Sequence, residues 1–142
     1  MDAEPARQRL LAQHDQIRGH LNACSIWARR LRDGEPVQRE LDAALARLRE
    51  DFIEHNATET DLVRPLLRGS RGWGTVLIDR MLEEHVAEHA AFWDLLAGSA
   101  SEVAGRMDEL IEELDAHMAA EERTFLSPLV LDAAVIARRR TP

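Results

Sequence analysis

Apolar side chains recur every three to four positions in four long stretches of the chain, roughly residues 5–31, 37–67, 74–97 and 102–127. This spacing lines up one apolar face on an α-helix. None of the stretches alternates apolar and polar residues with the two-residue period of a half-buried strand. The pattern therefore predicts an all-α fold with four amphipathic helices.

Breaks rich in glycine, proline and serine separate the stretches, at RDGEP (32–36), RGSRGWG (68–74) and AGSAS (97–101). Ser99 or Ser101 is placed to cap the fourth helix. Because short connections make successive helices antiparallel, the sequence predicts an up-down-up-down four-helix bundle. We expect one domain over residues 1–142, with a short C-terminal extension at 129–142.

Every predicted helix carries at least one histidine on its apolar face, and two helices add a carboxylate. The candidate ligands are His14, His55, Glu59, His85, His89, His117 and Glu121. At 1.5 Å per residue, one histidine of each helix lies about 15–18 Å from the same end of the predicted bundle. An unpaired polar ring in a core costs stability, so a cluster at one depth indicates a shared partner.

Imidazoles and carboxylates without thiolates suit iron, manganese or zinc. Seven ligands are too many for one ion, and they suit two ions that share both carboxylates. Three histidines on one ion and two on the other would leave the second ion an open position for a small molecule. A single histidine on an apolar face is usually a hydrogen-bonded core residue, but that explanation would have to hold separately in four helices.

Composition narrows the range of partners and compartments. The net charge of −8 argues against binding to nucleic acid or an anionic membrane. One cysteine, Cys24, rules out an internal disulfide and fits a reducing compartment. No apolar run approaches the roughly 18 residues of a membrane span. We expect a cytoplasmic protein.

Four short motifs in order resemble the hemerythrin family, specifically its bacterial HHE cation-binding domains. They are HDQIR from His14, HNATE from His55, HVAEH from His85 and HMAAEE from His117. The resemblance covers about residues 6 to 130. It implies a non-heme centre of two iron ions, rather than manganese or zinc, with an oxo or hydroxo bridge.

One position departs from the oxygen-carrying hemerythrins, which end in a histidine and an aspartate five residues apart. Here His117 is followed by Glu121 at four residues and Glu122 at five. The helical wheel places Glu121 in the apolar face and Glu122 about 100° away. We therefore predict Glu121 as the bridging ligand, with Glu122 as the alternative.

Other polar and aromatic residues receive lesser roles. We expect His20 to lie at the boundary of the core, or else to support the ligands from behind. Cys24 is expected to be a small core residue, with a redox-sensing thiol as the alternative. Trp93 is placed to help wall the ligand pocket. No histidine follows a glutamate by three residues, which disfavours a ferritin-like di-iron site.

Several functions remain open from the sequence. A dioxygen carrier, store or sensor is favoured by the best-known relatives, and a sensor would need a protein partner. The alternatives are an enzyme that disproportionates peroxide or reduces nitric oxide, a protein that handles iron or repairs iron centres, and a bundle with a vestigial site. An enzyme would need proton delivery, for which Glu122 and His20 are the candidates.

Overall fold

The structure, a computed structural model, describes residues 3–63, 74–124, 126 and 127. Within α4 several side chains, that of His85 among them, lie outside the described residues. The elements are α1 (Ala3–Arg32), α2 (Gln38–Thr58), the π-helical turn η1 (Glu59–Val63), α4 (Gly74–Leu96), α5 (Ala100–Gly105) and α6 (Met107–Arg123). The described residues contain no strand, so the predicted all-α class is confirmed.

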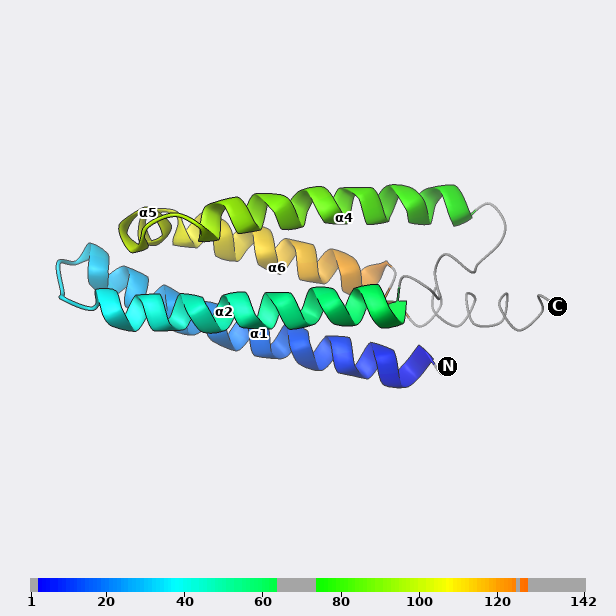
Figure 1. The fold of residues 1–142 in the computed structure, drawn as a ribbon, viewed down its shortest axis with the longest axis horizontal. Coiled ribbons are helices and arrows are strands. Elements are labelled where there is room, and N and C mark those ends of the chain that lie inside the picture. The colour runs from blue at the N-terminus through cyan, green and yellow to red at the C-terminus, as the bar shows by residue number, and fades with distance from the viewer. Residues whose placement is uncertain (1–2, 64–73, 125, 128–142) are drawn as a thin grey trace.

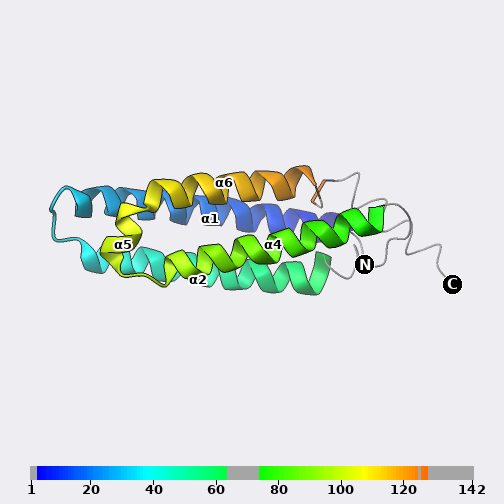
Figure 2. The same cartoon turned by 90° about the horizontal axis from the view of Figure 1, so that it is seen from above.

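The long helices run alternately up and down the bundle (Figures 1 and 2). The starts of α1 and α4 and the ends of α2 and α6 lie at one end, on the right in Figure 1. Helix α1 packs against α2 and α6, and α4 packs against α6. Among the described residues, no helix is both long and apolar enough to cross a membrane.

The predicted break at 32–36 is a tight turn between α1 and α2. Gly34 adopts a φ of 90°, a conformation that costs a glycine little. Its N–H donates to Leu31 O at 3.0 Å, and the N–H of Glu35 donates to Arg30 O at 3.0 Å. These bonds satisfy the last carbonyls of α1 and turn the chain back into α2.

The fourth predicted helix is divided in two. Ser99 caps α5 by accepting a hydrogen bond from Glu102 N at 3.3 Å, as one of the two predicted caps. Helical geometry stops at Arg106, with φ −112° and ψ 10°, directly after Gly105. Glycine is a poor helix former, so the chain bends there, and α5 crosses the end of the bundle before α6 starts (Figure 2). The single helix predicted over 102–127 was wrong in this respect.

The second predicted helix also changes character near its end. Residues beyond Thr58 form the π-helical turn η1, and residues 64–67 of the predicted stretch lie outside the described residues. The hydroxyls of Thr58 and Thr60 donate to Glu54 O and Asn56 O, both at 2.9 Å. Such bonds to the preceding turn bend helices, and π-helical turns are frequent at functional sites.

The apolar core fills the half of the bundle beside the 33–37 turn and α5. Its fully buried members include Leu21, Cys24, Ala28, Leu41, Leu45, Leu48, Val103, Met107 and Leu110. Cys24 is 0% exposed and belongs to this core, as expected. Polar side chains gather in the other half, near the end where the helices α1 and α4 start.

Candidate metal centre

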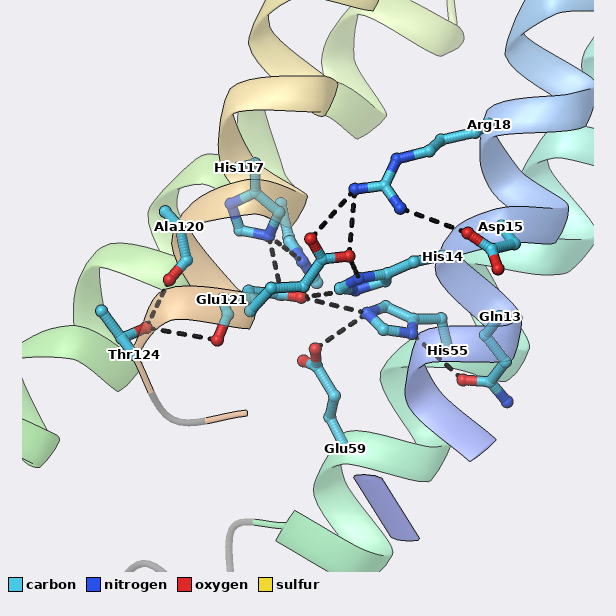
Figure 3. A network of polar contacts seen from close by, with 12 residues as sticks. Gln13, His14, Asp15, Arg18, His55, Glu59, His117, Ala120, Glu121 and Thr124 are labelled. Carbon is cyan, nitrogen blue, oxygen red and sulfur yellow. Dashed lines mark hydrogen bonds and ion pairs between the residues drawn. The ribbon is translucent and has the colours of Figure 1, made fainter. Parts of the chain in front are cut away.

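Six of the seven predicted ligands meet inside the bundle, and all of them except His89 are labelled in Figure 3. They are His14, His55, Glu59, His89, His117 and Glu121, and each is 8% exposed or less. They come from α1, α2, η1, α4 and α6, so residues from the whole chain build one cluster. The seventh, His85, lies in α4, but its side chain is outside the described residues.

His14 is held from both sides of its ring. Its Nδ1 lies 3.0 Å from Glu122 Oε1, and its Nε2 lies 2.8 Å from Glu121 Oε2. Because the Glu122 carboxylate accepts, the Nδ1–H of His14 donates to it. The other ring nitrogen, Nε2, faces the Glu121 carboxylate in the centre of the cluster.

His55 is oriented by a chain of neutral groups. The Thr58 hydroxyl donates to Glu54 O, so its oxygen accepts from Gln13 Nε2 at 2.9 Å. The carbonyl oxygen of Gln13 therefore faces His55 and accepts from Nδ1–H at 3.0 Å. The Nε2 of His55 is left facing Glu59 Oε1 at 2.8 Å.

Glu121 lies between the two sides of the cluster, with one oxygen toward each. Its Oε2 is 2.8 Å from His14 Nε2 and 3.4 Å from His55 Nε2. Its Oε1 is 3.0 Å from His117 Nε2, which lies 3.0 Å from His89 Nε2. The adjacent Glu122 is 29% exposed and meets His14 on the opposite edge of the ring.

The ligand atoms form two groups that share Glu121. The first contains His14, His55, Glu59 and Glu121, and the second contains His89, His117 and Glu121. Within each group the ligand atoms lie within 4.8 Å of one another. A carboxylate common to both groups, with its two oxygens directed apart, is the arrangement expected of a bridging ligand.

Imidazoles and carboxylates in the cluster shift one another's pKa values. Burial would lower the pKa of His55, but hydrogen bonds with Glu121 and Glu59 outweigh it and raise the pKa to about 9. Burial would raise the pKa of Glu121, but bonds with His117, His14 and His55 hold it well below its ordinary value. A ring nitrogen facing a carboxylate at 2.8 Å needs a proton or a metal ion between them. The nitrogen and oxygen donors present are those that iron, manganese and zinc accept.

Two phenylalanines close the deep side of the cluster. Phe52 meets His89 edge-on at 5.7 Å between ring centroids, and Phe92 meets His117 edge-on at 5.5 Å. The two phenylalanine rings are 5.9 Å apart. Trp93, expected to wall the pocket, is half-buried and packs behind Phe52 at 6.2 Å. These rings separate the polar cluster from the apolar core and keep its dielectric low.

One ligand of the second group, His117, borders a groove at the surface. A groove of about 400 Å³ opens between α4 and α6 and is lined by Ala91, Phe92, Glu113, Ala116, His117 and Ala120. His117 is 6% exposed there. Small alanine side chains leave this space, which brings small solutes near the second group of ligands.

Sequence reasoning missed the residues that orient the ligands. Gln13 is 9% exposed and holds His55 from across the helix pair, and Arg18 holds Glu122. The one available signal was a glutamine inside an apolar stripe, directly beside His14. His20 lies at the core boundary with 29% of its side chain exposed, as expected, and its Nδ1 contacts Asp51.

Comparison with known proteins gives one result. The profile of the hemerythrin HHE cation-binding domain matches residues 6–129 of the chain. No curated protein and no solved structure matches significantly. The matched span contains every residue of the two ligand groups.

Proposed function

The chain belongs to the hemerythrin HHE cation-binding domain family, and from this premise we propose that it binds two iron ions and, at one of them, dioxygen. The observation that carries the proposal is the pair of ligand groups that share Glu121. The protein would then act as a carrier, a store or a sensor of dioxygen. As a sensor it would signal through a protein partner.

The two oxygens of Glu121 support a pair of ions rather than one. Oε2 faces the histidines of α1 and α2, while Oε1 faces the histidine of α6. A single ion would use only one of the two groups of ligands. Two ions use both groups, with Glu121 between them.

The two groups differ in their number of histidines. His89 and His117, with the predicted ligand His85, give one ion three imidazoles, whereas His14 and His55 give the other two. If Glu59 and Glu121 both bridge, as the sequence predicts, the ion beside His14 and His55 would have one protein ligand fewer and would keep a position for a small ligand. A ferrous ion beside His14 and His55 would supply the chemistry, because ferrous iron binds dioxygen, nitric oxide or peroxide.

The protein side of the site is already organised for this role. Glu122 and Gln13 take the Nδ1–H of His14 and His55, which leaves both Nε2 atoms as ligands. Phe52 and Phe92 exclude water from the deep side, which slows loss of bound ions and side reactions.

The test is the visible spectrum of anaerobically iron-loaded, reduced protein before oxygen, after oxygen and after an argon purge. A charge-transfer band that appears with oxygen and disappears on purging supports dioxygen binding. Irreversible oxidation to a ferric spectrum would overturn it in favour of peroxide or nitric oxide chemistry, or of iron handling. Apo-protein treated in the same way is the control for free iron.

A further inference from the structure

The two histidines of the first ligand group have different partners behind them. His14 donates its Nδ1–H to the Glu122 carboxylate at 3.0 Å, whereas His55 donates to the neutral Gln13 amide at the same distance. The Gln13 chain is buried and ends on a backbone carbonyl. The Glu122 chain instead runs outward toward solvent.

Arg18 completes the outward chain. Its Nη2 donates to both carboxylate oxygens of Glu122, at 3.0 and 3.2 Å. The side chains are 0% exposed at His14, 29% at Glu122 and 36% at Arg18. Arg18 also borders a groove of about 510 Å³ between α1 and α6, with Asn22, Ser25 and Asp115 among its other lining residues. Three residues thus connect the buried centre to the surface.

The position of Glu122 excludes it as a second bridge. It contacts the Nδ1 edge of His14, while Glu121 and the other ligands face the Nε2 edge. The ring of His14 therefore stands between Glu122 and the place where ions would lie. Glu122 therefore reaches an ion by hydrogen bonding only through this ring.

A charged acceptor behind an imidazole changes the ring as a ligand. Hydrogen bonds to an ionised carboxylate are stronger than those to a neutral amide. The stronger bond shifts charge toward Nε2 and makes the ring a better electron donor to a metal ion. Arg18 fixes the carboxylate in the geometry that achieves this.

We propose that Glu122, held by Arg18, is a positioning residue that acts through His14 to make this ligand a stronger electron donor than His55. The inference rests on the proposed function. It attributes the difference between His14 and His55 as ligands to the salt-bridged carboxylate of Glu122. An ion bound by the first ligand group is held more tightly than it would be if both histidines donated to neutral amides. It also favours the oxidised state more.

Glu122→Gln tests this directly, because it gives His14 the same kind of partner that His55 has. The substitution is isosteric and lies at a partly exposed position, so the fold is retained. Glu112→Gln, an exposed position on the same helix, is the matched control. The readouts are zinc affinity by chelator competition and the reduction potential of the iron-loaded protein.

We expect Glu122→Gln to lower the affinity for the more affected zinc ion on the order of tenfold. This is the low end of the effect of residues that hydrogen-bond to metal ligands. The ferric-to-ferrous ratio at fixed potential should fall about tenfold, which corresponds to about 59 mV for one electron. A residue with only a structural role would not move the potential. Zinc affinity and potential equal to those of Glu112→Gln would overturn the proposal.

The two readouts separate this proposal from the proposed function. If the protein binds zinc but no iron, the di-iron function fails, and a zinc effect of Glu122→Gln still supports the role of Glu122. If it binds two irons and Glu122→Gln changes neither readout, the role of Glu122 fails while the di-iron function stands.

Discussion

The two halves of the bundle, on either side of Phe52, are built on opposite principles. Toward the 33–37 turn, residues such as Leu45 and Leu110 fill the interior, and each is 1% exposed or less. Toward the start of α1, buried histidines and glutamates at 8% exposure or less share the interior with a few apolar residues such as Leu10 and Leu126. The long helices run through both halves (Figure 1).

The difference separates what folds the protein from what gives it a function. Apolar burial stabilises the first half by about 25 cal/mol per Å² removed from water, and it needs no ligand. The second half buries ionised groups, whose desolvation is offset only when they are paired. A bound cation offsets that cost, so metal binding and stability are linked in this half alone.

The largest expected effect comes from removing the carboxylate that both ligand groups share. Glu121→Ala should abolish the binding of two irons, since each group loses a ligand. Glu122→Ala should keep two irons with affinity lower on the order of 10–100-fold. Iron per chain after anaerobic loading and desalting measures both. The reverse order would place the bridging ligand at Glu122.

A large cavity in the apolar half should act on stability without acting on the site. Leu45 is 1% exposed, so Leu45→Ala should lower the free energy of unfolding by about 2–5 kcal/mol. Iron per chain should stay at the wild-type value. Urea unfolding measures the free energy of unfolding, and iron analysis measures iron per chain. Arg47→Ala, at an exposed position on the same helix, is the control. Loss of iron from folded Leu45→Ala would show that the two halves are not separable.

The pH dependence of the metal-free protein should report the polar half. His55 has its pKa raised to about 9, so the folded state holds an extra proton between pH 6.5 and 9. The stability contributed by this group is complete below pH 6.5 and is lost as the pH rises through 9. The loss is on the order of 3 kcal/mol, at about 1.4 kcal/mol per pKa unit.

Urea unfolding with a chelator at pH 6 and pH 9.5 tests this dependence. His55→Gln should flatten it, because the titrating group is gone. A metal-loaded sample should also be flatter, since an ion takes the place of the proton. A wild-type stability that does not fall over this range would contradict the assignment.

The smallest expected effect concerns the thiol of the apolar half. Burial raises the pKa of Cys24 to about 11, against a weaker lowering by the charge of Arg49. Native protein at pH 8 should therefore react with iodoacetamide on the order of 10²-fold more slowly than unfolded protein, because few thiolates form. Mass spectrometry follows the reaction. Rapid alkylation of Cys24 in the native protein would instead support the alternative of a redox-sensing thiol.

The fold and the cluster were largely predictable from the sequence because helical periodicity is a local signal. His14, His55 and His117 fall on apolar faces that the sequence shows directly. Their common distance from one end of the bundle follows from their positions along the helices. The division at Arg106 was not readable, since a single glycine is tolerated inside many helices. The π-helical turn at Glu59 accompanies hydrogen bonds from the hydroxyls of Thr58 and Thr60 to the preceding turn. Such bonds compete only weakly with a regular helix, so the sequence gives little sign of them.

The partners that orient the ligands were the least predictable part of the site. Gln13 meets His55 across 42 residues of sequence, and Glu122 meets His14 across 108. Such pairs depend on how two helices are rotated against each other, which no local pattern records. Glu122 was weighed as a bridge or a proton donor, and the structure instead shows it behind the His14 ring.

Iron stoichiometry tests the central claim most directly. Metal-free protein is loaded anaerobically with excess ferrous iron, desalted and analysed for iron and protein. We expect two irons per chain, because two ligand groups share Glu121. One iron per chain would contradict the paired groups, and none would contradict the iron centre altogether.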